Sequence, residues 1–149
     1  MDLLQDRHLY TGIVETAKLP IIYNIVHQQS QEIGIMLTSF PKDINSYIDQ
    51  LNALDAQHDP GHTTSFLAFP ESPPKGIDLS AKQARNALRL STLLRLKESK
   101  GEKICLITTP EALFGHVPSL ETFANNTCML KVGNRSVSYT HLTLPTNGT

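Results

Sequence analysis

The residues best placed to do chemistry lie between Gly12 and Leu19, in the segment Gly-Ile-Val-Glu-Thr-Ala-Lys-Leu. Its spacing follows the phosphate-binding loop G-x-x-x-x-G-K-[ST], in which backbone amides wrap the phosphates, the lysine reaches the terminal phosphates and the hydroxyl holds magnesium. Gly12 and Lys18 occupy the expected positions, but Ala17 replaces the second glycine and Leu19 replaces the hydroxyl residue. The segment therefore predicts a vestigial nucleotide loop or, alternatively, an ordinary loop that enters a helix.

The proline at position 20 bears on the same loop. Proline disfavours the helical conformation in the residue before it, so Leu19 is expected to be extended and the helix to begin no earlier than Pro20. Such a helix, running to Gln31, would carry its free amides and its dipole away from a phosphate at the loop.

Other kinds of catalysis find little support in the sequence. No two of the 14 Asp and Glu residues are adjacent, so the acidic pair of an ATPase is missing. His58 and His62 have the H-x3-H spacing of a metal site, but no third ligand is evident and a solvated loop is the alternative. The serines and His116 lack the context of a nucleophile. We therefore expect no catalytic residue and no metal site in this chain.

One local charge feature stands out. Seven of the 13 basic residues lie between Lys82 and Lys103, against Glu98 and Glu102 alone, a local balance of +5 (seven minus two). Lys82, Arg85 and Arg89 repeat at i, i+3 and i+7, which places them on one face of a helix. They predict a patch for DNA phosphate or for a protein partner; the alternative is a solvated helix face.

The composition limits the class of protein. A chain of 149 residues with a net charge of -1 fits one domain, and its charge does not draw it to nucleic acid or to an anionic membrane. Cys105 and Cys128 each lie in an apolar run without a C-x-x-C partner, as buried thiols of a reducing compartment do. The apolar runs are too short to span a membrane, and the N-terminus lacks the basic head of a signal peptide. These features predict a soluble cytoplasmic protein.

Apolar runs and helical periodicities alternate along the chain. Strands are expected over 33–40, 65–69, 103–109 and 127–132, and helices over 20–31, 41–54 and 79–98, with short helices from Pro110 and Pro118. Apolar residues cover a broad arc of the third helix, namely Ala84, Ala87, Leu88, Leu90, Leu93, Leu94 and Leu96. The alternation predicts an α/β fold, a parallel sheet flanked by helices.

The segment Ser136 to Thr149 departs abruptly from this composition and resembles the conceptual translation of a sequencing adapter. It is therefore set aside as a non-native tail. The domain is expected to comprise residues 1–135, and the native protein to continue beyond Arg135.

Several segments, in their order and spacing, resemble one family. They are Thr11-Gly12-Ile13 with Ala17-Lys18, Ile35 to Pro41, Phe69-Pro70-Glu71, Arg89 to Leu93, Ile107 to Leu113, and Leu130 to Gly133. Together they make residues 10–135 similar to the N-terminal module of the bacterial transcription-repair coupling factors (Mfd). That module is built like the damage-recognition protein UvrB, so the resemblance implies a P-loop NTPase-like domain with a degenerate nucleotide loop.

The resemblance also implies a function and partners. Such factors displace stalled RNA polymerase from DNA with an ATP-driven translocase and recruit UvrA for nucleotide excision repair. The motor, with its ATP and magnesium, and the polymerase-binding and UvrA-contacting parts would follow Arg135, so this chain would be a scaffold that binds no cofactor. The basic patch would then face DNA or the remainder of the parent chain. The alternatives are the N-terminal part of an ATP-binding excinuclease subunit or superfamily 2 helicase, or a stand-alone interaction domain.

Overall fold

A computed structural model describes residues 9–58, 61 and 64–125 of the chain. The chain divides into two compact units, residues 1–116 and 117–149. The first unit contains α1 (Glu15–Gln28), β1 (Ile33–Leu37), a 3-10 turn η1 (Pro41–Asp43), α2 (Ile44–His58), β2 (Ser65–Phe69), α3 (Leu79–Glu98), β3 (Ile104–Thr108) and α4 (Pro110–Leu113). In the second unit the structure describes α5 (Leu120–Asn125), whose first turn is capped by the Ser119 hydroxyl, which accepts from the Thr122 amide.

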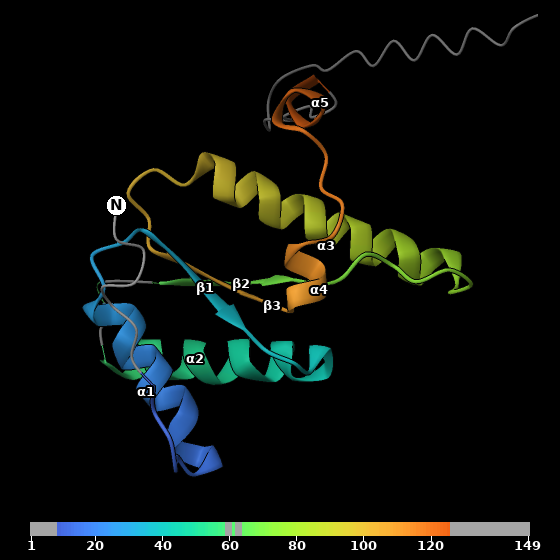
Figure 1. Ribbon diagram of the computed structural model, residues 1–149. Helices are drawn as coiled ribbons and strands as arrows, with labels where there is room; N and C mark the ends of the chain where they lie inside the picture. The colour runs from blue at the N-terminus through green and yellow to red at the C-terminus, as the bar shows by residue number, and fades with distance from the viewer. Residues whose placement is uncertain (1–8, 59–60, 62–63, 126–149) are drawn as a thin grey trace, which may run out of the picture. The chain divides into compact units, whose positions relative to one another are not determined.

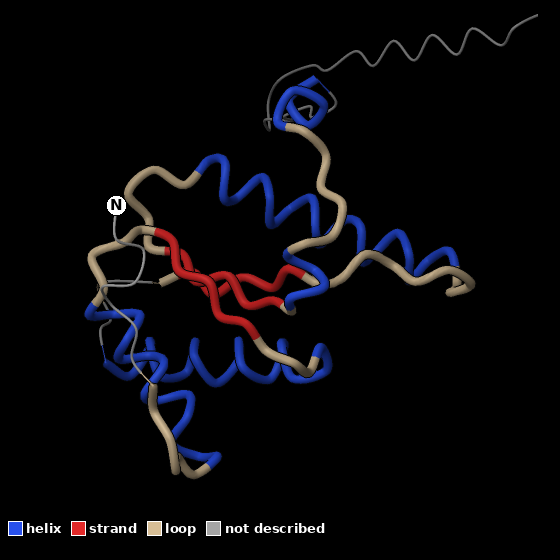
Figure 2. The backbone as a smooth tube through the Cα atoms, in the orientation of Figure 1, coloured by secondary structure: helices blue, strands red, loops and turns tan. Residues whose placement is uncertain are grey.

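The three strands form a parallel sheet in the order β1-β3-β2, which confirms the predicted fold class of a parallel sheet flanked by helices. The connection from β1 to β2 crosses the sheet in one direction and the connection from β2 to β3 returns. Right-handed connections therefore place α2 and α3 on opposite faces, as Figure 1 shows. The tube in Figure 2 shows the same layers, with helices on both sides of the three strands.

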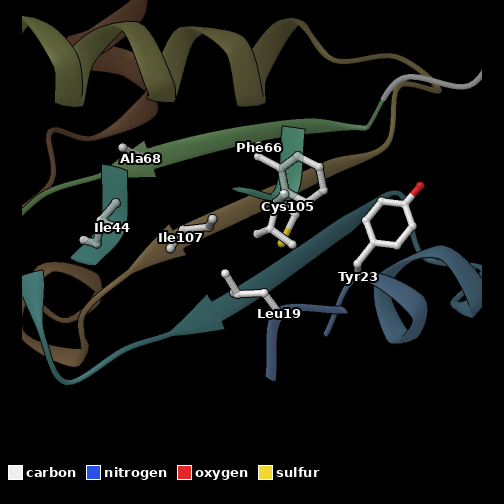
Figure 3. Close-up of a cluster of buried hydrophobic side chains, with 8 residues drawn as sticks. Leu19, Tyr23, Ile44, Phe66, Ala68, Cys105 and Ile107 are labelled. Carbon is white, nitrogen blue, oxygen red and sulfur yellow. The ribbon is translucent and has the colours of Figure 1, made fainter. Parts of the chain in front are cut away.

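The core lies on both faces of β3, all five residues of which are buried. The register aligns Ile35, Leu106 and Leu67 across the sheet, so their side chains point to one face and the next residues point to the other. The first face packs against Leu93 and Leu96 of α3. On the second face a larger cluster joins α1, α2, β2 and β3 (Figure 3). Its buried members are Leu19, Tyr23, Ile44, Leu51, Phe66, Ala68, Cys105 and Ile107.

The start of the first helix was predicted wrongly. α1 begins at Glu15 and holds Pro20 within it, and Leu19, expected to be extended, is helical. Leu19 and Tyr23, one turn apart, are 7% and 4% exposed. Burial of these two side chains in the core offsets the hydrogen bond that Pro20 cannot donate. Packing thus outweighs the local preference of the residue before proline.

Other boundaries differ by a few residues. The strands are shorter than predicted, ending at Leu37 and at Thr108, and Pro41 begins the 3-10 turn rather than the helix, which runs on to His58. The helix expected from Pro118 begins at Leu120. The predicted strand over 127–132 and the predicted non-native tail over 136–149 lie outside the described residues, as do His62 and Cys128.

Candidate functional site

The predicted nucleotide loop is short in the structure. Gly12 has a φ of 69°, a conformation that glycine adopts readily, but only Ile13 and Val14 separate it from the start of α1. Ala17, Lys18 and Leu19 lie within the helix, where the Ala17 amide donates to the Val14 carbonyl over 3.0 Å. A phosphate cradle needs several consecutive amides that are free to turn toward the ligand. Because α1 begins at Glu15, only two of the four residues between Gly12 and Ala17, namely Ile13 and Val14, remain outside the helix to form a loop.

The side chains of this loop do not converge either. The Lys18 amine donates to the Glu15 carboxylate over 2.5 Å, and this hydrogen bond, with the negative charge of Glu15, raises the pKa of Lys18. Lys18 and Glu15 line a cavity of about 210 Å³ together with Tyr47. Leu19 points instead into the core. The cation is therefore already paired with a carboxylate, which would repel a phosphate at the same place.

The three predicted basic residues of α3 occupy three different environments. Lys82 is exposed, Arg85 is half-buried and Arg89 is buried. The Arg89 guanidinium donates to the carbonyls of Pro70 and of His116, the latter over 3.1 Å, and lies 4.3 Å from the centroid of the Phe69 ring. Burial lowers the pKa of Arg89. Arg89 thus fastens α3 to the ends of β2 and α4, and does not share a surface with Lys82.

A crevice opens at the carboxyl ends of the strands, between the start of α2 and the first half of α3. We call this cavity of about 420 Å³ the carboxyl-end crevice. Its walls are mostly apolar and carry three polar side chains. The polar side chains are those of Asn45, Glu71 and Arg85. The complete lining consists of Pro41, Ile44, Asn45, Ala68, Pro70, Glu71, Ala81, Ala84, Arg85 and Leu88. This crevice was not predicted from the sequence, although a proline follows each strand within four residues, at Pro41, Pro70 and Pro110.

Hydroxyl groups order the backbone beside this crevice. The Thr109 hydroxyl donates to Glu71 Oε1 over 3.0 Å and accepts from the Ala112 amide, which caps α4. The neighbouring Thr108 hydroxyl donates to the Phe69 carbonyl over 2.7 Å. The ends of β2 and β3 are thereby held together, and one oxygen of Glu71 is occupied.

A second polar cluster, also missed from the sequence, joins α1 to α2. Tyr23 donates to Asp55 Oδ1 over 3.2 Å, His27 Nε2 lies 3.3 Å from the same oxygen, and Asp55 Oδ2 accepts from the Thr64 amide over 3.1 Å. His27 Nδ1 is buried and has no partner in the described part of the chain. A catalytic base would need that nitrogen to face a substrate. This cluster is therefore suited to fixing two helices rather than to moving protons.

The histidine pair proposed as a metal site is only partly described. His58 Nδ1 lies 3.0 Å from the Leu54 carbonyl of its own helix, while His62 falls outside the described residues. Across residues 9–58, 61 and 64–125, no group of three or more His, Cys, Asp or Glu side chains is arranged to hold a metal ion. Cys105 is buried in β3, and burial raises the pKa of its thiol to about 11.

The edge of the sheet formed by β1 is unfinished in the described chain. Ile33, Ile35 and Leu37 are 47%, 53% and 51% exposed, on the face that α3 covers over β2 and β3. The other side of β1 borders a cavity of about 360 Å³ lined by Ile22, Ile25 and Val26 of α1. We call the outer edge of β1, the three half-exposed side chains and this cavity the β1 edge surface.

Comparison with known proteins identifies no relative: no protein-family model, no curated protein and no solved structure matches the chain. None of the helices in the described ranges is long and apolar enough to cross a membrane.

Proposed function

We propose that this chain is the N-terminal scaffold module of a bacterial transcription-repair coupling factor. In this role it binds and hydrolyses no nucleotide. It positions the parts of the parent chain that displace RNA polymerase and recruit UvrA. Two of the segments that carry the sequence resemblance, Arg89 to Leu93 in α3 and Ile107 to Leu113 across β3 and α4, belong to the packed first unit. They support the proposal as parts of the scaffold.

The observation that carries the proposal is the β1 edge surface. Ile104 donates to the Glu32 carbonyl over 2.7 Å, and Thr38 donates to the Thr108 carbonyl over 2.9 Å. Because pairing alternates with a period of two, the peptide groups of Ile33, Ile35 and Leu37 point away from β3. Parallel sheets are normally covered on both faces, and an exposed apolar edge strand is a template for pairing with another strand. This edge therefore suits a further strand and a covering helix from the remainder of the parent chain.

The geometry around Gly12 supports the same proposal against a live ATP site. The only lysine of the loop is paired with Glu15, and the helix begins at Glu15, two residues before the position of the motif's second glycine. In an excinuclease subunit or helicase with a working loop, the lysine reaches the phosphates and the glycine-rich backbone before the helix surrounds them. Titration calorimetry of the chain with magnesium ATP is expected to show no micromolar binding. A micromolar dissociation constant would transfer the proposal to the ATP-binding class.

The scaffold role is tested by recovering the uninterrupted gene and the intact parent protein. The reading frame is expected to continue beyond Arg135 into a translocase motor. In hydrogen exchange, the peptide covering residues 32–38 should be strongly protected in the parent and weakly protected in the 149-residue chain, while residues 104–108 stay protected in both. A stop codon near Arg135, or equal exchange of residues 32–38 in the two proteins, would reject the scaffold role.

A further inference from the structure

The carboxyl-end crevice has the position and size of a small-molecule site. In open parallel sheets, ligands bind beyond the carboxyl ends of the strands, where loops leave a gap that the helices do not fill. The crevice lies there, between the start of α2 and α3, and its volume of about 420 Å³ falls within the range of ligand pockets. All the residues that line it belong to the first unit of the chain. Nothing in the scaffold role requires such a cavity.

One charged group in the crevice lacks a partner. Arg89 is bonded to two carbonyls, and Arg95 donates to Glu102 over 2.7 Å. Arg85, half-buried on the same helix, makes no hydrogen bond or ion pair with any residue in the described ranges. A guanidinium that is partly withdrawn from water gains most from a planar anion that it can bind through two parallel hydrogen bonds.

The remaining walls restrict the anion to a single charge. Glu71 also lines the crevice, and its negative charge disfavours a phosphate dianion. The Asp43 amide, at the turn that enters α2, is already bonded to the Phe40 carbonyl and adds no donor. Ile44, Ala68 and Leu88 offer apolar contact to the body of a ligand. We propose that the carboxyl-end crevice binds a monocarboxylate with an apolar body, whose carboxylate pairs with Arg85.

The inference is tested by titrating the ¹⁵N-labelled 149-residue chain with 4-phenylbutyrate and, separately, with its uncharged amide. The acid should shift the amide signals of Ala68, Glu71, Ala84 and Arg85 in a saturable way, and the carboxamide should bind about tenfold more weakly because it cannot form the charged pair. Added salt should weaken only the acid. Equal affinity for the acid and the amide, or no saturable shift in the crevice, would overturn the proposal.

Two variants distinguish a specific ion pair between Arg85 and the carboxylate from attraction by the net charge of the protein. Arg85→Gln should weaken 4-phenylbutyrate binding about tenfold, whereas Lys100→Gln removes the same charge from the turn after α3 and should leave the affinity unchanged. Because Arg85 has no partner in the described chain, its replacement should leave the signals of β3 in place. Equal weakening by both variants, or by neither, would reject Arg85 as the carboxylate-binding residue. Both outcomes are independent of nucleotide binding and of the parent protein.

Discussion

At the scale of single residues, burial rather than residue type decides what the charged groups do. Arg89 and Arg85 are one turn apart on α3. Arg89 is bonded to two carbonyls, whereas Arg85 lines a crevice and has no hydrogen-bond or ion-pair partner among the described residues. The i, i+3, i+7 spacing predicts that Lys82, Arg85 and Arg89 share one side of a helix, and all three lie in α3. The spacing could not show that burial increases along this side of α3, from the exposed Lys82 to Arg89, which contacts the chain after β2 and after α4.

We expect replacement of Asp55 to destabilise the fold strongly. Asp55 is 6% exposed and accepts hydrogen bonds from the Tyr23 hydroxyl and from the Thr64 amide. Asp55→Ala removes the carboxylate that accepts from the buried Thr64 amide and from Tyr23, and it should lower the free energy of unfolding by about 2 to 3 kcal/mol. Asp49→Ala, which removes an exposed carboxylate from the same helix, should change it by less than about 0.5 kcal/mol. Urea unfolding measures both. Equal values for the two variants would show that the Tyr23–Asp55 link contributes nothing.

Burial of the Cys105 thiol should make the free energy of unfolding depend on pH. Its pKa is raised from 9.0 to about 11 by burial, so between these two values the unfolded chain releases a proton that the folded chain retains. The contribution of this thiol is intact below pH 9 and declines as the pH rises toward 11. The free energy of unfolding should therefore fall more steeply in the native chain than in Cys105→Ala over this range. Because the other groups titrate in both proteins, parallel slopes in urea unfolding would contradict the assignment.

At the scale of elements, the sequence predicted the three described strands, but the predicted start of α1 was wrong. The apolar runs around Ile35, Leu67 and Leu106 predicted parallel strands covered on both faces. β3 is buried along its whole length, but β1 has no buried residue. Their order could not be read from the sequence, since it depends on how the connections cross the sheet. The arc of α3 was visible, but not that only its second half, with Leu93 and Leu96, covers the sheet. The crevice combines residues from four elements and had no local signal.

Pro20 offers a test of how α1 is stabilised. It is exposed inside the helix, so Pro20→Ala removes little packing and restores an amide that can donate to the Thr16 carbonyl. The free energy of unfolding should rise by about 1 to 3 kcal/mol. Pro110→Ala, at the first position of α4, should bring no gain because that amide has no partner within a helix. A loss of stability in Pro20→Ala would show that α1 depends on the proline itself.

At the scale of the whole molecule, the first unit has a well-packed centre and an unfinished side. β3 is buried throughout, whereas β1 exposes about half of each of three large apolar side chains, and its outer edge pairs with no strand in the part of the chain that the structure describes. A strand of this kind is a template for pairing with another chain. The net charge of -1 adds little repulsion between copies. The β1 edge surface is therefore where the chain should associate with itself.

A lysine at the β1 edge surface should prevent this self-association. Ile35→Lys places a charge in the middle of the exposed row, and its side chain is 53% exposed, so the fold should tolerate it. Sedimentation velocity over a range of concentrations should show association of the native chain and a monomer for Ile35→Lys. Ser39→Lys adds the same charge at an exposed position beyond the end of β1 and should associate like the native chain. If both lysine variants are equally monomeric, net charge controls association; if the native chain is itself monomeric at every concentration, its free edge is shielded by another part of the chain.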